Sequence, residues 1–167
     1  MISPAEMPYR PCVGIMLLND AGSIWIGRRC KRIVEDPANW QMPQGGIDPD
    51  EDPSTAALRE LAEETGTDKA HIIGESSLFH HYELPPELLG IALQGRFRGQ
   101  RQKWFAMRFL GQDADFNIHH PLGGHEAEFD AWRWASAGEV IELITPFKRQ
   151  VYLAVLDEFR HLTQTSA

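Results

Sequence analysis

The acidic side chains between Asp48 and Glu64 are the part of this 167-residue sequence whose types and spacing suggest chemistry. Glu60, Glu63 and Glu64 stand three and four positions apart, so a helix would place them as neighbours on one face. Like charges at that spacing repel by about a few tenths of a kcal/mol per pair in water. Divalent cations remove this repulsion, and Mg²⁺ prefers carboxylate and phosphate oxygens. The spacing therefore indicates a metal site, although a solvated acidic helix face has the same pattern.

The residues that precede these glutamates could build a site around them. Gly45 and Gly46 would let the backbone approach a ligand closely or adopt a positive φ angle, although an ordinary tight turn also uses such glycines. Glu51 and Arg59 could pair across the junction between loop and helix. Such a pair would orient the site without taking part in its chemistry.

A helix over Pro53–Thr65 is predicted to carry the glutamates. Asp52 followed by proline is typical of an N-cap and a first helical position, and Gly66 is a plausible helix stop. Leu58 and Leu61 would face a core at i, i+3 spacing.

Other segments must supply the sheet and the remaining helices. The predicted extended segments are Pro11–Asn19, Ser23–Arg29, His71–Leu84, Arg101–Leu110 and Glu128–Ala135, of which the first two would form a hairpin. Loops are expected at Cys30–Asn39 and Pro85–Gln100, a short helix at Ser136–Ile144, and an amphipathic helix at Thr145–Leu162. Strands with interspersed helices predict a mixed α/β sandwich.

Composition limits the classes of function. The length suits one domain, expected at residues 8–162 with flexible ends at 1–7 and 163–167. The formal net charge of −8 argues against nucleic-acid binding driven by global charge. A phosphorylated substrate would need bound cations or a local basic cluster, because either can reverse the sign of a site.

Cysteine content and hydropathy favour a cytoplasmic protein. Cys12 and Cys30 have no metal-ligand spacing and are expected to be reduced thiols. The N-terminal residues lack the pattern of a signal peptide. The longest apolar run, near Val13–Leu18, is about six residues and too short to span a membrane.

Gly45, Glu51 and the run Arg59–Gly66 together resemble the Nudix box, the motif of the Nudix hydrolases, in a fixed frame of 23 residues. One departure is Thr67, where the family usually has a bulky aliphatic residue in a packing position. The resemblance implies the Nudix α/β/α sandwich, with a mixed β-sheet between helices. It also implies hydrolysis of a nucleoside diphosphate linked to another group, assisted by Mg²⁺ or Mn²⁺.

The resemblance assigns roles to the matching residues. It implies that Glu60 and Glu64 are the main metal ligands and that Glu63 is a further ligand or the base that activates water. Glu51 and Arg59 would be the orienting pair, and the carbonyl of Gly45 would complete the metal shell. These roles agree with the chemistry, because metal ions neutralise a polyphosphate and lower the pKa of bound water.

Segments outside the box resemble one subfamily, which contains the bacterial RNA pyrophosphohydrolases and the dinucleoside polyphosphate hydrolases of bacterial and plant type. These segments are Tyr9–Leu17, Trp40–Asp48, Gly99–Phe109, Glu128–Ala135 and Pro146–Tyr152. The resemblance implies removal of pyrophosphate from 5′-triphosphorylated RNA ends, or asymmetric cleavage of diadenosine tetraphosphate to ATP and AMP. The loops Arg32–Asn39 and Pro85–Arg98 resemble the diadenosine polyphosphate variant.

The subfamily resemblance extends to a distant carboxylate and to residues around the nucleobase. It implies that Glu128 joins the metal shell or acts as base, although an acid at a strand start needs no function. Arg10, Phe147 and Lys148 would surround the base. Phe147 would stack on a purine, or it would instead hold the last helix to the core.

The same resemblance implies phosphate contacts from Arg28, Tyr82 and Lys103. For Arg28 and Lys103 the alternative is a solvated position on a strand edge. Gln41 and Gln44 are expected to line the substrate cleft.

Tryptophans and histidines have plainer interpretations. Trp104, Trp132 and Trp134 are expected in the core or on a sheet face, while Trp40 beside the glycines is ambiguous. A zinc site is not expected, because the histidines lack a helical i, i+4 pairing. They are His80, His81, His119, His120 and His125.

Two further functions stay open at this point. The chain could be a Nudix hydrolase for another substrate, such as ADP-ribose or an oxidised nucleoside triphosphate, although the similarity outside the box argues against it. It could also be a module that senses a nucleotide without cleaving it, but such modules commonly lose box glutamates. The expected partners are a nucleotide or a 5′-triphosphorylated RNA end, with no membrane and no obligate protein partner indicated.

Overall fold

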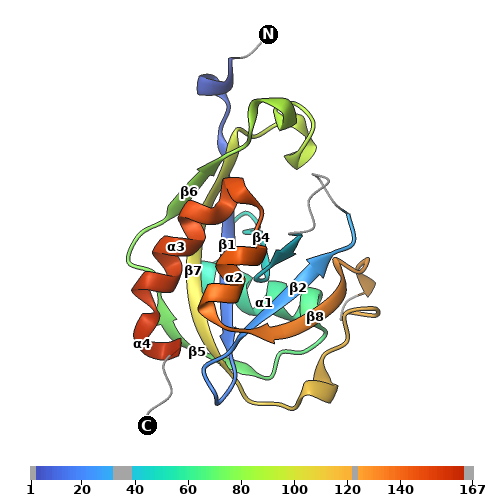
Figure 1. Cartoon of the computed structure of the whole chain (residues 1–167). Helices are drawn as coiled ribbons and strands as arrows, with labels where there is room; N and C mark the ends of the chain where they lie inside the picture. Colours follow the sequence, from blue (N-terminus) through green and yellow to red (C-terminus); the bar gives the residue numbers. More distant parts are fainter. Residues whose placement is uncertain (1–2, 32–38, 122–123, 164–167) are drawn as a thin grey trace.

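One mixed β-sheet runs through the middle of the molecule (Figure 1). The computed structural model describes residues 3–31, 39–121 and 124–163. Within these residues eight strands form the sheet: five follow the order β3-β2-β1-β7-β5, while β4 pairs with β1, β6 with β7 and β8 with β2. The strands are β1 (Tyr9–Leu18), β2 (Ile24–Arg29), β3 (Trp40–Gln41), β4 (Gln44–Gly46), β5 (Ala70–Glu75), β6 (His80–Glu83), β7 (Gly99–Phe109) and β8 (Phe129–Ala135).

The two longest strands, β1 and β7, pair in parallel along ten residue pairs, from Tyr9 opposite Gly99 to Leu18 opposite Arg108. The other described pairings are antiparallel. β1 and β2 pair with each other, as expected for the predicted hairpin. β1 also pairs with β4, so the glycines that precede the acidic helix are fixed to the central strand.

Each face of the sheet supports its own hydrophobic core, because successive side chains on a strand point to opposite faces. On β7, Trp104 and Ala106 belong to one core, whereas Phe105 and Met107 belong to the other. Helix α1 (Pro53–Thr65) packs on the second core, and helices α2 (Ala137–Leu143) and α3 (Arg149–Glu158) pack on the first. Figure 1 shows these helices on opposite sides of the sheet. The predicted mixed sheet between helices is confirmed.

Helix α1 has the predicted bounds and the predicted caps. The Asp52 side chain accepts a hydrogen bond from the Ser54 backbone nitrogen at 3.2 Å. Gly66 ends the helix in the left-handed region at φ 80°. Leu61 is fully buried and Leu58 is partly buried in the same core, so the predicted apolar face is the one that packs.

Two predicted elements are divided in the structure. The extended segment His71–Leu84 forms two strands, β5 and β6, because β7 is long enough to pair with both in turn. The C-terminal helix begins as a 3-10 turn at Pro146–Lys148, continues as α3 and breaks at Phe159, where φ is −101° and ψ is 17°. Helix α4 (Arg160–Thr163) follows. Phe159 is 3% exposed, so its burial fixes the position of the break.

Several predictions concern segments with little regular structure. The segment Pro85–Gln100 contains 3-10 turns at Pro86–Leu88 and Leu93–Gly95 before β7 begins at Gly99. Residues 32–38 of the other predicted loop lie outside the described residues, as do residues 1–2 and 164–167 of the predicted flexible ends.

Cys12 is buried, Cys30 is exposed, and both are free thiols. No described helix has the length and apolar character needed to cross a bilayer.

Gly66→Ala is expected to lower the free energy of unfolding. A Cβ at this position would lie 2.5 Å from the carbonyl oxygen of Asn117, and φ is +80°. The left-handed conformation alone costs an L residue about 1–2 kcal/mol. Urea unfolding measures the loss, with Gly138→Ala in α2 as the control, because a Cβ there meets nothing within 4 Å and alanine favours a helix. Equal losses in both variants would contradict this account of Gly66.

Candidate functional site

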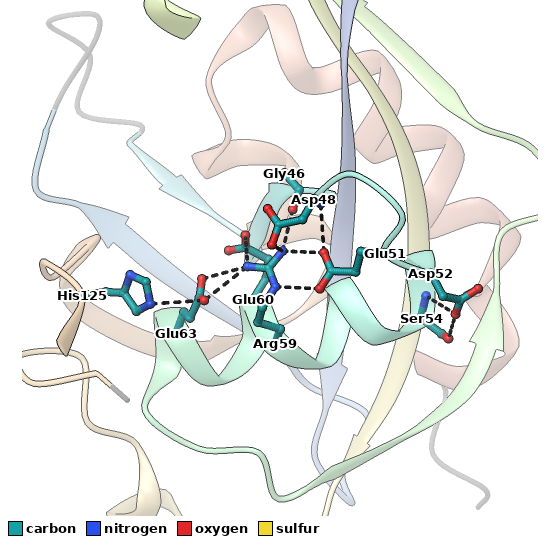
Figure 2. Close-up of polar contacts among 9 residues, drawn as sticks. All are labelled: Gly46, Asp48, Glu51, Asp52, Ser54, Arg59, Glu60, Glu63 and His125. Carbon is teal, nitrogen blue, oxygen red and sulfur yellow. Dashed lines mark hydrogen bonds and ion pairs between the residues drawn. The ribbon is translucent and has the colours of Figure 1, made fainter. Parts of the chain in front are cut away.

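Arg59 lies at the centre of a group of acidic side chains at the loop–helix junction (Figure 2). Its Nε and one terminal nitrogen donate to the two carboxylate oxygens of Glu51, each at 2.8 Å, and the same terminal nitrogen donates to the Gly46 carbonyl at 2.9 Å. The other terminal nitrogen donates to Glu60 at 3.0 Å and to Glu63 at 3.1 Å. The predicted ion pair between Glu51 and Arg59 is therefore present. The same guanidinium also offsets part of the repulsion between Glu60 and Glu63.

The charge state of this group is fixed by its hydrogen bonds. The donated hydrogen bonds of Arg59 lower the pKa of Glu51 to about 2, and the Asp48 backbone N–H, which donates to the same carboxylate at 3.0 Å, adds to the effect. The carboxylates in turn raise the pKa of Arg59 above its ordinary value, Glu51 most of all. Both partners of the pair are consequently charged across the physiological pH range.

Gly45 is required by close approach rather than by a turn. Gly45 and Gly46 lie in β4, and neither is among the glycines of the described chain with positive φ. A Cβ on Gly45 would overlap the carboxylate of Glu60, and one on Gly46 would lie 2.7 Å from a terminal nitrogen of Arg10. The missing side chains therefore make room for the carboxylate of Glu60 from α1 and the guanidinium of Arg10 from β1. The interpretation of these glycines as an ordinary tight turn is wrong.

A cavity of about 590 Å³ opens beside this strand and collects most of the predicted site residues. Its described lining includes Glu60 and Glu64 from α1, Glu128 just before β8, and Gly45 from β4. The predicted substrate residues that line it are Arg10, Gln41, Gln44, Tyr82, Phe147 and Lys148. Residues from four strands, one helix and the 3-10 turn before α3 thus meet at one place.

Glu64 and Glu60 are carboxylates held away from solvent. Glu64 is 8% exposed and accepts a hydrogen bond from the Gln44 backbone nitrogen at 3.3 Å. Burial raises its pKa well above the ordinary value, and the charges of Glu128 and Glu60 add to this effect. Burial, together with the charge of Glu63, raises the pKa of Glu60 to about 7. Ionised glutamates in this position need a positive partner, because burial of an unpaired charge is costly.

These carboxylates have the chemistry of a site for a hard divalent cation. Glu60, Glu64 and Glu128 offer oxygen donors around one cavity, which is the ligand type that Mg²⁺ and Mn²⁺ prefer. Among the described residues, no three His, Cys, Asp or Glu side chains lie close enough together to hold a metal ion by themselves. The set fits a cation whose remaining ligands come from water and from a phosphorylated ligand.

Glu63 points to a different place from Glu60 and Glu64. It accepts hydrogen bonds from Arg59, and the His125 Nε2 lies 3.2 Å from one of its oxygens (Figure 2). The described cavity lining does not include it. Each residue of a helix is rotated by about 100° from the previous one, so Glu63 and Glu64 diverge to either side of Glu60. Two of the three glutamates therefore line the cavity and the third lies beside it, and the role of Glu63 as a further ligand or as the base stays a prediction.

Strand pairing brings Glu128 to the cavity from a distant part of the sequence. Its backbone carbonyl accepts a hydrogen bond from the Cys30 nitrogen at 3.0 Å, which continues the ladder between β2 and β8. Its carboxylate lies 3.4 Å from a terminal nitrogen of Arg29, and its side chain is 43% exposed. Glu128 is therefore fixed through its backbone while its carboxylate stays accessible.

A buried lysine forms the floor of the cavity. Lys148 is 4% exposed, and its Nζ donates to the Oε1 of Gln41 at 3.1 Å. Burial, followed by the charge of Arg29, lowers the pKa of Lys148 to about 7. The Lys148 Nζ also lies 5.7 Å from the ring centroid of Tyr82 and 5.9 Å from that of Phe147.

Phe147 both packs on the core and lines the cavity, so the core role is confirmed while its stacking on a purine stays a prediction. It is partly buried against the core below α3. Its ring centroid lies 5.7 Å from that of Tyr82, at an interplanar angle of 50°. An aromatic corner of this kind offers a face on which a nucleobase can stack.

Arg28 and Lys103 lie outside the described cavity lining, and the prediction that they contact a phosphate stays a prediction. The Nε of Arg28 donates to Asp130 at 2.6 Å, and the Nζ of Lys103 lies 3.3 Å from Glu75. On β7, Gln100 lines the cavity, and Lys103, three residues further along the strand, points to the opposite face of the sheet. This alternation turns Lys103 away from the cavity.

Arg29, the neighbour of Arg28 in the sequence, lines the cavity. The pairing of β2 with β8 has an irregularity between these two arginines: Arg28 lies opposite Ala131 and Arg29 opposite Phe129, so Asp130 is skipped. A β-bulge of this kind re-aims a side chain. Its position depends on the pairing of two distant strands, and the sequence offers no local signal for it.

The tryptophans lie where the sequence predicted. Trp104 is fully buried, and Trp132 and Trp134 pack partly buried on the α1-side core. Trp40 packs against the other core, with the guanidinium of Arg28 5.9 Å from its ring centroid. The apolar wall of the cavity, by contrast, was missed by sequence reasoning. It consists of Leu84, Leu88, Ile91, Ala92 and Leu93.

The cavity brings carboxylates, basic side chains and an aromatic corner together in one space. A sequence profile described as NUDIX domain matches residues 8–155. The chain is 53% identical over 167 residues to the RNA pyrophosphohydrolase of Brucella abortus (strain 2308), covering 97% of this chain and 93% of that protein. It is 52% identical over 166 residues to the RNA pyrophosphohydrolase of Agrobacterium fabrum (strain C58), covering 97% and 98%.

Solved structures share the fold at low sequence identity. The C. elegans Ap4A hydrolase in a binary complex matches with a TM-score of 0.58 and 15% identity, over 90% of this chain and 98% of that one. The E. coli dihydroneopterin triphosphate pyrophosphohydrolase matches with a TM-score of 0.65 and 18% identity, over 90% and 99%. The chain belongs to the NUDIX domain family, as the box residues predict. Nudix hydrolases generally use divalent metal ions.

Glu51→Gln is expected to destabilise the protein at pH 7 and much less at pH 3. The folded-state pKa of Glu51, about 2, lies below the ordinary value of 4.5. Its contribution to stability is therefore fully present above about pH 4.5 and is lost as the pH falls toward 2. Urea unfolding of both proteins at pH 7, 5 and 3 measures the gap, with Glu142→Gln on the exposed side of α2 as control. A gap that did not narrow in acid would count against this role.

Gly45→Ala is expected to reduce hydrolytic activity by about 100-fold, because misplacement of a site group by about 1 Å has effects of this size. The added Cβ would displace the Glu60 carboxylate. The measurements are turnover and the Mg²⁺-induced rise in melting temperature, compared with those of Gly138→Ala. Unchanged values of both in Gly45→Ala would show that the close approach to Glu60 has no functional importance.

Proposed function

We propose that this chain is a metal-dependent pyrophosphohydrolase of nucleoside polyphosphates, with 5′-triphosphorylated RNA ends as its leading substrate. The observation that carries the proposal is the buried Glu64 carboxylate, which faces a cavity beside Glu60 and Glu128. Phe147 and Lys148 line the same cavity. Cation-binding oxygens and a base-sized aromatic corner therefore share one space.

The substrate assignment rests on the relatives. Proteins named RNA pyrophosphohydrolase are 52% and 53% identical to this chain over nearly its whole length. Asymmetric cleavage of diadenosine tetraphosphate to ATP and AMP is the second candidate, because that molecule also places a nucleoside next to a phosphate chain. The same similarity disfavours ADP-ribose and oxidised nucleoside triphosphates. A non-catalytic sensor is disfavoured because the three box glutamates are present.

Glu60, Glu64 and Glu128 would hold Mg²⁺ or Mn²⁺, with the Gly45 carbonyl nearby as a further oxygen donor. The bound cation would neutralise the phosphate chain and acidify a water molecule. In the reaction, water oxygen bonds to phosphorus, the bridging P–O bond breaks, and pyrophosphate leaves the monophosphorylated RNA end. Glu128, whose carboxylate is accessible, would accept the proton of the attacking water at a carboxylate oxygen.

The remaining side chains would position the site and the substrate. Arg59 holds Glu60 in place from the outside, and Glu63 stays beside the cavity with Arg59 and His125. Around the substrate, Phe147 would stack on a base and Arg10 would contact a phosphate. Lys148, Tyr82 and Gln44 line the same cavity and complete the substrate contacts that we propose.

The domain would extend over residues 8–162, since strand β1 at one end and helices α3 and α4 at the other belong to the same sheet-and-helix unit. A substrate at the 5′ end of bacterial RNA would place the reaction in the cytoplasm.

Glu64→Gln is expected to reduce turnover by at least about 100-fold, since even groups that only orient metal ligands have effects of 10–100-fold. The folded-state pKa of Glu64 is raised, so its ionised form destabilises the metal-free fold at pH 8, and this cost is absent at a pH below the ordinary value of 4.5. The variant is therefore expected to melt higher than wild type without metal and to gain less from Mg²⁺. Glu142→Gln is the control, and a full Mg²⁺ response in Glu64→Gln would contradict the ligand assignment.

The substrate is tested by comparing kcat/KM for a 5′-triphosphorylated RNA and for diadenosine tetraphosphate, with Mg²⁺ and with Mn²⁺. We expect the RNA to be preferred, with pyrophosphate as a product. If neither substrate is turned over, the proposed function is wrong, and release of phosphate products from ADP-ribose or an oxidised nucleoside triphosphate would then identify a different hydrolase.

A further inference from the structure

A row of buried polar side chains on β7 leads from the cavity into the core. Gln100, Gln102 and Trp104 stand at alternate positions, so all three point to the same face of the sheet. They are 2%, 1% and 0% exposed. Gln100 belongs to the described cavity lining, whereas Gln102 and Trp104 do not. Gln102 therefore acts on a ligand only through the side chains that it contacts.

The indole of Trp104 is the fixed end of this row. Its ring lies over Gly14, the residue opposite it on β1, where a Cβ would overlap the ring. The ring of Tyr152 packs edge-on against it, with centroids 5.5 Å apart at 82°. The indole nitrogen donates to the Oε1 of Gln102 at 3.0 Å. Because an indole nitrogen can only donate, this contact determines which end of the Gln102 amide is the oxygen.

The NH₂ group of Gln102 then sets the orientation of two further amides. It donates to the Oε1 of Gln100 at 2.7 Å and to the Oε1 of Gln44 at 3.1 Å. A primary amide has its acceptor at one end and its donors at the other. With both oxygens turned to Gln102, the NH₂ groups of Gln44 and Gln100 are the ends left for contacts in the cavity that both residues line.

The hydroxyl of Tyr82 agrees with this orientation of Gln44. Burial raises the pKa of Tyr82, and a hydrogen bond from the Gln44 side chain opposes that effect. A hydrogen bond lowers the pKa of a phenol when it is donated to the phenol oxygen. Gln44 thus presents its NH₂ group to Tyr82, which also lines the cavity.

The position of Gln44 indicates which part of a ligand meets these donors. Its backbone nitrogen donates to the carboxylate of Glu64 at 3.3 Å, so its side chain starts beside an acid that we propose as a cation ligand. The phosphate chain of a substrate would lie next to that cation. Phosphate oxygens are charged acceptors, so an NH₂ group attracts them and an amide oxygen repels them.

We propose that Gln102 is a positioning residue for phosphate binding, a role that rests on the proposed function. Trp104 orients Gln102, and Gln102 orients Gln44 and Gln100, so that donors and not acceptors meet the phosphate oxygens. Gln102 therefore contributes to substrate affinity without touching the substrate. Its effect belongs to binding, and the chemical step keeps its own groups.

Gln102→Glu tests the orientation directly, because a carboxylate can accept from Trp104 but cannot donate to Gln44 and Gln100. The two amides are expected to turn their NH₂ groups inward and their oxygens to the cavity. The dissociation constant of ADP with Mg²⁺, measured by calorimetry, should rise about tenfold, the scale of one hydrogen bond to a charged group. KM for 5′-triphosphorylated RNA should rise similarly, with kcat changed by less than about twofold, as loss of uniform binding predicts.

Gln102→Met keeps the shape of the side chain without a buried charge, so it decides the question if Gln102→Glu does not fold. It should weaken ADP binding in the same direction, and by less in a Gln44→Ala background, because residues that act together are not additive. The matched control is Ser76→Ala. Ser76 is 1% exposed and its hydroxyl accepts a hydrogen bond from the Trp104 backbone nitrogen, so its loss disturbs the same core without changing the amides.

The results separate this inference from the proposed function. Unchanged ADP binding in Gln102→Met, an equal loss in Ser76→Ala, or a fall in kcat with KM unchanged would overturn the positioning role, even if wild type hydrolyses polyphosphates normally. Absence of turnover by wild type on every polyphosphate would instead overturn the proposed function.

Discussion

The contacts of one guanidinium are the constraint on which the site depends. Glu51, Glu60 and Glu63 would repel one another, yet each accepts a hydrogen bond from Arg59. Arg59 also binds the Gly46 carbonyl, so it ties the helix to the strand that faces the cavity. A planar group with five donors can make all these contacts at once, which a lysine could not. The acids are thereby fixed before any cation binds.

Away from Arg59, the site keeps an electrostatic cost that it does not resolve by itself. Glu64 is buried, and the charges of Glu60 and Glu128 add to the effect of burial on its pKa. Such an arrangement is unfavourable for the metal-free fold and favourable for binding a divalent cation, because ligand binding stabilises the state that binds it. The family of this chain generally uses divalent metal ions, which accords with that balance. The left-handed backbone of Leu93 and Gln94 is a second local cost beside the same cavity.

The sheet decides which of the basic side chains reach the cavity. Arg28 and Arg29 are neighbours in sequence, and the irregular pairing of β2 with β8 determines that Arg29 lines it. Lys103 is turned away by the alternation of β7, whereas Lys148 enters from the 3-10 turn before α3. Loss of solvent then lowers the pKa of Lys148 to about 7, a property that depends on burial and not on residue type.

The sequence by itself determined the helix Pro53–Thr65, its caps and the pair of Glu51 with Arg59, because these depend on contacts between residues close along the chain. It also determined the family, because the box motif is a pattern of residue types at fixed spacing. It also indicated the strands from their apolar patterns. Only the tertiary structure decided that Glu64 is buried while Glu63 lies beside the cavity, that Gly45 makes room for Glu60, and that Arg29 lines the cavity instead of Arg28. These outcomes depend on strand register, on a bulge and on exclusion of water by distant segments, and such contacts between remote parts of the chain leave no local pattern in the sequence.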